Sequence, residues 1–215
     1  MFGELSGEFL IRSIEDRIEK WERCADGSLL VKPKKANFDE LAVIFRRIFM
    51  DTEYNFIATI SLVKDPKDRN KALRIFQRFG DLSFELRWKG GLLTKKPIFV
   101  ESTPPIHNKK ALELDSELGA FLNSQEGLMM KIQKLKPEEL SINLMPLGDF
   151  NPSNSVKDAT GFSLSLDQSP AQVSWVISLS KIIYRTVDYP SKVRAIFDVL
   201  DDLSGVLREI NRRHS

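Results

Sequence analysis

The strand on which the predicted fold depends reads YNFIATISLV over residues 54–63. Its even-numbered side chains from Phe56 to Leu62 are all apolar, whereas the odd-numbered ones include Thr59 and Ser61. A period of two residues is typical of a β-strand with one face in the core. We therefore take this segment as the first strand of the main sheet and work outward from it.

The elements after this strand predict an α+β fold. Asp65 and Pro66 begin a helix that ends at Gly80, and Gly90-Gly91 forms a turn between two strands. The order β-α-β-β-α-β indicates a ferredoxin-like core. The further expected elements are strands over 82–88 and 97–100, a helix from Asn108 to Phe121, a strand or alternatively a helix over 128–135, and a strand over 140–147. The side chains expected to be buried are Ile60, Phe76, Phe84, Leu86, Leu118 and Ile177.

Two helices and a short strand are expected before residue 54. Residues 9–25 repeat apolar side chains at three- and four-residue spacing, which predicts a helix that ends at Gly27. Asn37 and Glu40 form a capping-box pattern that predicts the start of a second helix. Residues 28–31 between the two helices predict a short strand.

The C-terminal part of the sequence predicts a helical hairpin. Residues 169–187 are read as one helix, with a strand as the alternative because the run is rich in β-branched residues. Residues 191–213 repeat apolar side chains at heptad spacing. The expected division is 1–52 as an N-terminal helical segment on the core, 53–150 as the α+β core, 151–168 as a linker and 169–215 as the hairpin, all in one compact unit.

Composition gives few functional constraints. The chain has 215 residues and a net charge of +2, from 32 basic and 30 acidic residues, so a general affinity for polyanions is not expected. Cys24 is the single cysteine, which fits a reducing compartment. The sequence has no run long and apolar enough to span a membrane and no secretory signal pattern, so we expect a cytoplasmic protein.

No catalytic constellation is recognisable in the sequence. The two histidines, His107 and His214, lie far apart and have no metal-ligand spacing with Cys24. Phosphate-binding glycine loops and the nucleophile elbow are also missing, and the Ser-x-x-Lys match at residues 178–181 has none of the partner motifs of the enzyme group that uses it. We expect neither a catalytic residue nor a metal or cofactor, and a non-enzymatic protein is favoured over an enzyme.

A basic stripe is predicted on the helix that follows Asp65. Its cations recur every three or four residues and therefore share one face, opposite apolar side chains. Two further cations project from one face of the next strand. Such residues can follow the phosphates of a nucleic acid. This candidate nucleic-acid site consists of Lys67, Lys71, Arg74, Arg78, Arg87 and Lys89.

A second candidate site depends on reading residues 169–187 as a helix. Lys181 and Arg185 then share a narrow polar stripe with two serines on an otherwise apolar helix. We expect this stripe to be the solvent-facing edge of the helix. The alternative is that Lys181 and Arg185 bind an anionic small molecule.

The last helix predicts an interface. Its apolar stripe is long enough to extend past the core, so we expect a homodimer in which Leu203, Leu207 and Ile210 are buried against a second copy. The first expected function is accordingly a self-associating interaction or assembly protein. A nucleic-acid-binding accessory protein is the second, and an enzyme or binder acting on an anionic small molecule is the third.

Overall fold

The fold was analysed in a computed structural model, and the residues described are 2–48, 51–63, 66–79, 83–91, 95–102, 113–114, 117–146, 173–184 and 188–213. Its helices are α1 (Phe2–Ile14), α2 (Arg69–Phe79), α3 (Glu117–Asn123), α4 (Glu126–Leu135) and α5 (Tyr189–Arg213), with short 3-10 helices η1 (Glu15–Arg17) and η2 (Pro66–Asp68). Its strands are β1 (Ile18–Arg23), β2 (Leu29–Pro33), β3 (Glu40–Ile48), β4 (Asp51–Ser61), β5 (Ser83–Lys89), β6 (Lys96–Ser102), β7 (Glu113–Leu114), β8 (Glu139–Pro146) and β9 (Val173–Ile182).

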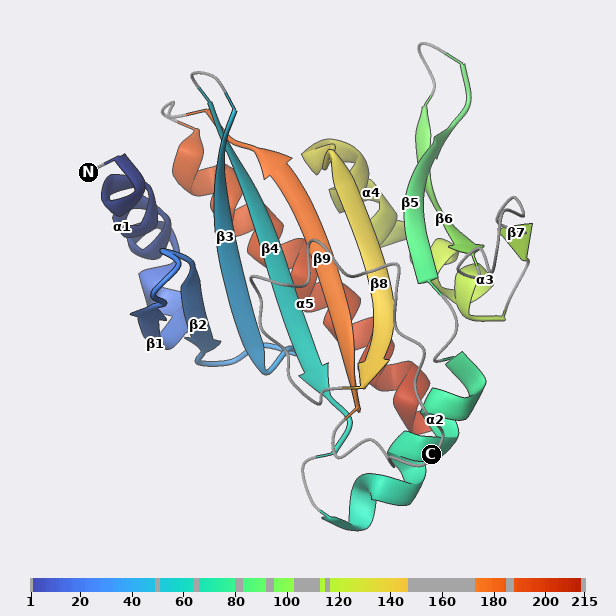
Figure 1. Cartoon of the computed structure of the whole chain (residues 1–215). Coiled ribbons are helices and arrows are strands. Elements are labelled where there is room, and N and C mark those ends of the chain that lie inside the picture. Colours follow the sequence, from blue (N-terminus) through green and yellow to red (C-terminus); the bar gives the residue numbers. More distant parts are fainter. Residues whose placement is uncertain are drawn as a thin grey trace, which may run out of the picture.

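A single antiparallel sheet joins all the strands of the described residues, in the order β1-β2-β3-β4-β9-β8-β5-β6-β7. Figure 1 shows α5 crossing one face of this sheet, behind β4, β9 and β8. The α+β class predicted from the sequence is confirmed. The ferredoxin-like core is not confirmed, because it would place β4 between β6 and β8, whereas β4 lies between β3 and β9.

The core lies between the sheet and α5. Trp175 of β9 is fully buried, and its indole Nε1 donates a hydrogen bond of 2.9 Å to Oδ1 of Asn211 on α5. At the other end of α5, the hydroxyls of Tyr54 and Tyr189 lie 3.2 Å apart in a buried cluster of rings. Of the side chains predicted to be buried, Ile60, Phe84, Leu118 and Ile177 are, whereas Phe76 and Leu86 are partly buried.

The predicted helix over residues 9–25 is wrong in its second half. The helix ends at Ile14, and residues 18–23 form β1, which pairs with β2 across a tight hairpin. Gly27 has a φ of +85°, and Oδ1 of Asp26 accepts hydrogen bonds from the backbone N–H and hydroxyl of Ser28. Asp-Gly is a strong hairpin signal, and it decides the local structure here over the helical spacing.

The predicted helix after Asn37 is also wrong, since residues 40–48 form β3. The capping-box pattern does not act as a cap, because the backbone N–H of Asn37 bonds to Oδ1 of Asp201 on α5. The segment 1–52 is therefore not a helical unit. It contributes β1, β2 and β3 to the sheet.

The C-terminal helical hairpin is replaced by a strand and a helix. Residues 173–182 form β9, which pairs with β4 on one side and β8 on the other. The alternative of a strand in this run is therefore correct, and the proposed division at residue 169 does not separate a C-terminal unit from the sheet. Segment 151–168 lies outside the described residues.

Residues 128–135 form part of α4, so the helix, given as the alternative to a strand for this run, is correct.

Charged contacts fix α5 to its neighbours along its length. Arg194 pairs with Asp16 at 2.8 Å and Asp198 with Arg17, both next to α1. One turn further along α5, Nζ of Lys131 on α4 lies 2.6 Å from Oδ2 of Asp202, and this hydrogen bond raises the pKa of the lysine. These charged flanks of α5 are thus bonded within the chain.

Candidate nucleic-acid interface

The helix α2 separates an apolar face from a basic one. Its buried side chains are Ala72, Ile75 and Phe79, spaced so that they share one side of the helix. The ring of Phe79 packs against the indole of Trp175 with centroids 6.1 Å apart. These contacts fix the rotation of α2 on the sheet, so the side that carries the cations must face outward.

The outward side of α2 carries the predicted basic stripe. Lys71, Arg74 and Arg78 are exposed on α2, and Lys67 is exposed on the 3-10 helix η2 directly before it. Arg78 pairs with Glu117 of α3 at 3.0 Å and lies over the ring of Phe79. Neither Lys71 nor Arg74 forms an ion pair with another described residue. The structure therefore exposes all four predicted residues, three of them on the outward side of α2.

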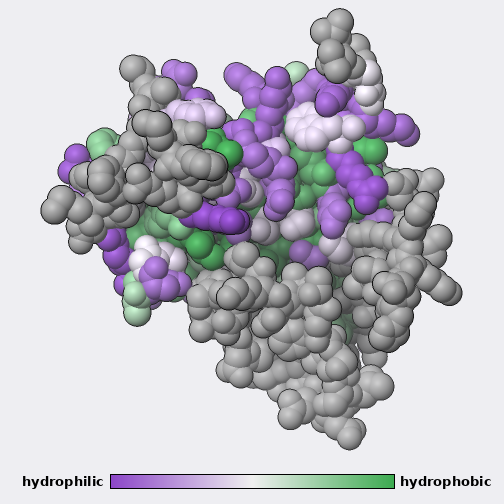
Figure 2. All heavy atoms as spheres, turned by 45° about the horizontal axis from the view of Figure 1, so that its top comes forward, coloured by the Kyte–Doolittle hydropathy of each residue, from purple (hydrophilic) through white to green (hydrophobic). Residues whose placement is uncertain are grey.

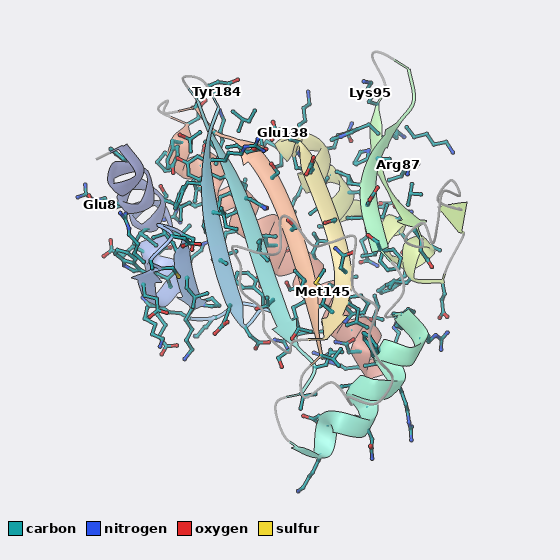
Figure 3. The ribbon with its side chains drawn as sticks, viewed as in Figure 1. Glu8, Arg87, Lys95, Glu138, Met145 and Tyr184 are labelled. Atoms are coloured by element: carbon teal, nitrogen blue, oxygen red, sulfur yellow. The ribbon has the colours of Figure 1, made fainter. Side chains whose placement is uncertain are left out.

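The other two predicted cations lie on a different surface. Arg87 and Lys89 are exposed on β5, and Lys89 lies opposite Lys96 of β6. Figure 1 shows α2 at the lower end of the sheet and the β5–β6 hairpin pointing to the upper end. Figure 3 labels Arg87 and Lys95 on this hairpin, and Figure 2 shows hydrophilic side chains gathered over that end of the sheet. The six predicted residues therefore form two separate basic groups.

Lys181 is held by groups of the chain itself. Its ammonium donates a hydrogen bond of 2.6 Å to the backbone carbonyl of Lys136, which caps α4, and lies 3.0 Å from Oε1 of Glu138. Oε2 of the same carboxylate accepts a 3.0 Å bond from the backbone N–H of Ile182. Lys181 thus ties the end of α4 to β9 with its charge compensated. Arg185, the second residue of the predicted anion site, lies outside the described residues.

The residues predicted to form a dimer interface are part of the core. Leu203, Leu207 and Ile210 expose 0%, 0% and 3% of their surface in the single chain. The physical reason is that α5 lies along the sheet instead of extending past it, so β9 and the neighbouring helices cover its apolar stripe. These three side chains have no surface left to offer a second copy in this fold.

Two hollows lie beside the second half of α5. The larger, of about 580 Å³, is lined by residues of α4 and α5 that include Glu126, Asp202 and Glu209. The smaller, of about 290 Å³, has an apolar floor with Phe121 and Ile210. Because carboxylates line the larger hollow, it does not add to the basic surface of α2.

One buried acid, Glu101 on β6, was not singled out from the sequence. It is 3% exposed, its Oε2 has no hydrogen-bond partner among the described residues, and burial raises the pKa of its carboxyl. Its side chain lies on the core face of β6, and the residue pairs with buried Phe84 of β5. The signal was present in the sequence, since Glu101 follows Pro97 and Phe99 at a spacing of two.

Within the described ranges, no three His, Cys, Asp or Glu side chains gather as a metal ion would require. None of the described helices is long and apolar enough to cross a bilayer. Comparison with family models, curated proteins and solved structures gives no significant match to this chain.

Proposed function

We propose that this chain binds nucleic acid through the outward side of α2. The observation that carries the proposal is the exposure of four cations. Lys71, Arg74 and Arg78 lie on the side of α2 opposite the buried face that anchors it in the core, and Lys67 lies on η2 directly before this helix. The anchoring matters because a fixed row of charges loses less conformational freedom on binding than a mobile one.

The dimensions of the row suit a phosphate backbone. From Lys67 on η2 to Arg78 on α2 the chain rises about 17 Å, at about 2.0 Å per residue in the 3-10 turn and about 1.5 Å per residue in the α-helix. One strand of duplex DNA presents a phosphate every ~3.4 Å along its axis, so the row faces about five phosphates. Lys71 and Arg74 can approach phosphates without breaking an ion pair to another described residue, whereas Arg78 would exchange its exposed pair with Glu117 for a phosphate.

Such contacts position a protein on nucleic acid without reading its sequence. Lysine and arginine in the row meet the backbone, and the described residues of this side offer no exposed aromatic ring for stacking on bases. We therefore expect binding that depends on salt and that differs little between sequences.

Neutralising the row tests the proposal. We expect the fourfold variant Lys67→Gln, Lys71→Gln, Arg74→Gln, Arg78→Gln to flatten the slope of log K against log salt by about three to four units. The measurement is fluorescence anisotropy with labelled single-stranded and duplex DNA and RNA, starting at about 50 mM salt. The Arg78–Glu117 pair is exposed, so its loss costs less than about 1 kcal/mol of stability.

The β5–β6 hairpin supplies a matched control. A variant with Arg87, Lys89, Lys95 and Lys96 changed to Gln removes the same charge from the other basic group. It should bind with a slope close to that of the unmodified chain. If the wild-type chain binds none of the probes at about 50 mM salt, or if only the hairpin variant loses binding, α2 is not a nucleic-acid site.

A further inference from the structure

The strand β1 forms one edge of the sheet in the described part of the chain. It pairs with β2 on one side, and five of its six residues are exposed. Trp21, at the middle of the strand, exposes 43% of its surface. An exposed edge with a central tryptophan is a surface on which another strand can pair.

The hydrogen-bond pattern shows which residues of β1 can bond outward. The N–H of Cys24 donates to the carbonyl of Ser28 at 2.9 Å, so these two residues form a hydrogen-bonded pair of the β1–β2 ladder. Bonded and non-bonded pairs alternate along an antiparallel ladder. Trp21, which lies opposite Val31, is therefore in a non-bonded pair, and its N–H and C=O point away from β2.

The charges of Lys20 and Glu22 beside Trp21 are not paired with other charges among the described residues. Lys20 and Glu22 point to the same face of the sheet, and Lys20 lies opposite Lys32 of β2. The carboxylate that meets Lys32 is that of Glu19, at 3.0 Å. Neither Lys20 nor Glu22 forms an ion pair with a described residue. Lys20 thus sits beside a like charge without a carboxylate of its own.

We propose that β1 pairs with β1 of a second copy of this chain, antiparallel and with Trp21 on the two-fold axis. In this register Trp21 exchanges both backbone hydrogen bonds with Trp21 of the second copy. Lys20 then lies opposite Glu22 of the second copy, and Glu22 opposite its Lys20. These are non-bonded pairs, in which the side chains come closest. The two indoles form a cross-strand aromatic pair at the axis.

The neighbouring registers are less favourable, either in their backbone hydrogen bonds or in the charges that they place opposite each other. Every other residue from 19 to 23 is charged, so centring the axis on any of them places two like charges directly opposite each other, which is destabilising. Centring it between two residues pairs an outward-bonding residue with an inward-bonding one, which an antiparallel ladder does not allow. Among these registers, the one centred on Trp21 alone satisfies both the backbone and the charges.

Pairing of two β1 strands leaves neither copy with a free β1 edge for a third copy. An isologous contact uses the β1 edge of both copies. At the opposite edge of the described sheet lies β7, which has two residues. The irregularity between Ile18 and Lys20 also limits how far the pairing can extend along β1. We therefore expect a discrete dimer and no longer assembly.

Charge reversal tests the register. Lys20→Glu places two carboxylates opposite each other in both symmetric pairs, and Glu22→Lys likewise opposes two lysines, so each should weaken dimerisation by about tenfold or more. The double variant Lys20→Glu, Glu22→Lys restores opposite charges and should dimerise like the wild type. The measurement is sedimentation equilibrium over a wide range of concentration, with 24.6 kDa as the monomer mass.

A backbone variant separates strand pairing from other contacts. Trp21→Pro removes the outward N–H and the indole but leaves the bonds of Lys20 and Glu22 to β2, so it should be a folded monomer by circular dichroism and mass. Several outcomes overturn the proposal: a wild type that stays at 24.6 kDa throughout, single variants that dimerise like the wild type, a double variant that does not regain the dimer, or a mass above that of a dimer.

Discussion

The burial of Leu207 gives a direct test of how α5 is used. This side chain has no exposed surface in the single chain, and it lies on the buried side of α5. Leu207→Ala removes most of a fully packed side chain, which should lower the free energy of unfolding by about 3 kcal/mol. For 215 residues the unfolding entropy is about 0.45 kcal/mol/K, so the melting temperature should fall by about 7 °C.

The assay is urea unfolding followed by circular dichroism, combined with the mass of the folded variant. Met130→Ala is the control, because Met130 is 70% exposed and its truncation should change stability by less than about 0.5 kcal/mol. If Leu207→Ala kept the wild-type stability and converted a dimer to a monomer, the residue would belong to an interface and α5 would be placed incorrectly.

Two further predictions concern a buried acid and a turn. Burial raises the pKa of Glu101, so the folded chain holds that proton more tightly than the unfolded chain, and stability should fall as the pH rises from about 4.5 through the raised value. Glu101→Gln should remove this dependence and be the more stable form at neutral pH in urea unfolding, whereas Glu117→Gln on the surface should not. Gly27→Ala should lower the free energy of unfolding by about 1 kcal/mol in the same assay. The cost is backbone strain at a φ of +85°, because no described atom lies within 4 Å of the Cβ position. An unchanged stability would mean that the turn adopts another conformation.

The parts of the fold that the sequence predicted correctly have one unambiguous period. The even-numbered residues from Phe56 to Leu62 are all apolar with polar residues at 59 and 61 between them, and the helix after Pro66 has both a start signal and a single apolar face. The 191–213 helix is long enough for its spacing to be clear. In each case one secondary structure alone separates the apolar side chains from the polar ones.

One error falls where apolar residues are so frequent that two periods fit. In β9, Trp175, Ile177 and Leu179 share the core face, but Val176 between them is buried as well, so the run also fits a helix apolar on most sides. The strand is favoured because β4 and β8 are available on both sides to pair with it. Those neighbours lie far away in the sequence, and local periodicity cannot include them.

The candidate site was predictable in part for a related reason. Predicting the basic stripe needed only the period of one helix, and its four cations are exposed as expected, three on α2 and Lys67 on η2. Whether Arg87 and Lys89 share a surface with this stripe depends on the direction of β5 relative to α2. That direction is set by the topology of the whole sheet, which local periodicity does not reveal. The pairing of Lys181 with Glu138 likewise required β8 and β9 to be neighbours.

The two surfaces considered for self-association differ in what they specify. Burying an apolar stripe is worth about 25 cal/mol per Å² whether the covering surface belongs to the same chain or to another. The apolar stripe of α5 therefore predicts that these side chains are buried, but it does not predict which surface packs against them. In this fold that surface is the sheet of the same chain. An edge strand is more restrictive, because the alternation of its hydrogen bonds allows only every second register and its charges then discriminate among those. In β1 both requirements meet at Trp21, between a lysine and a glutamate that have no ion pair within the described chain.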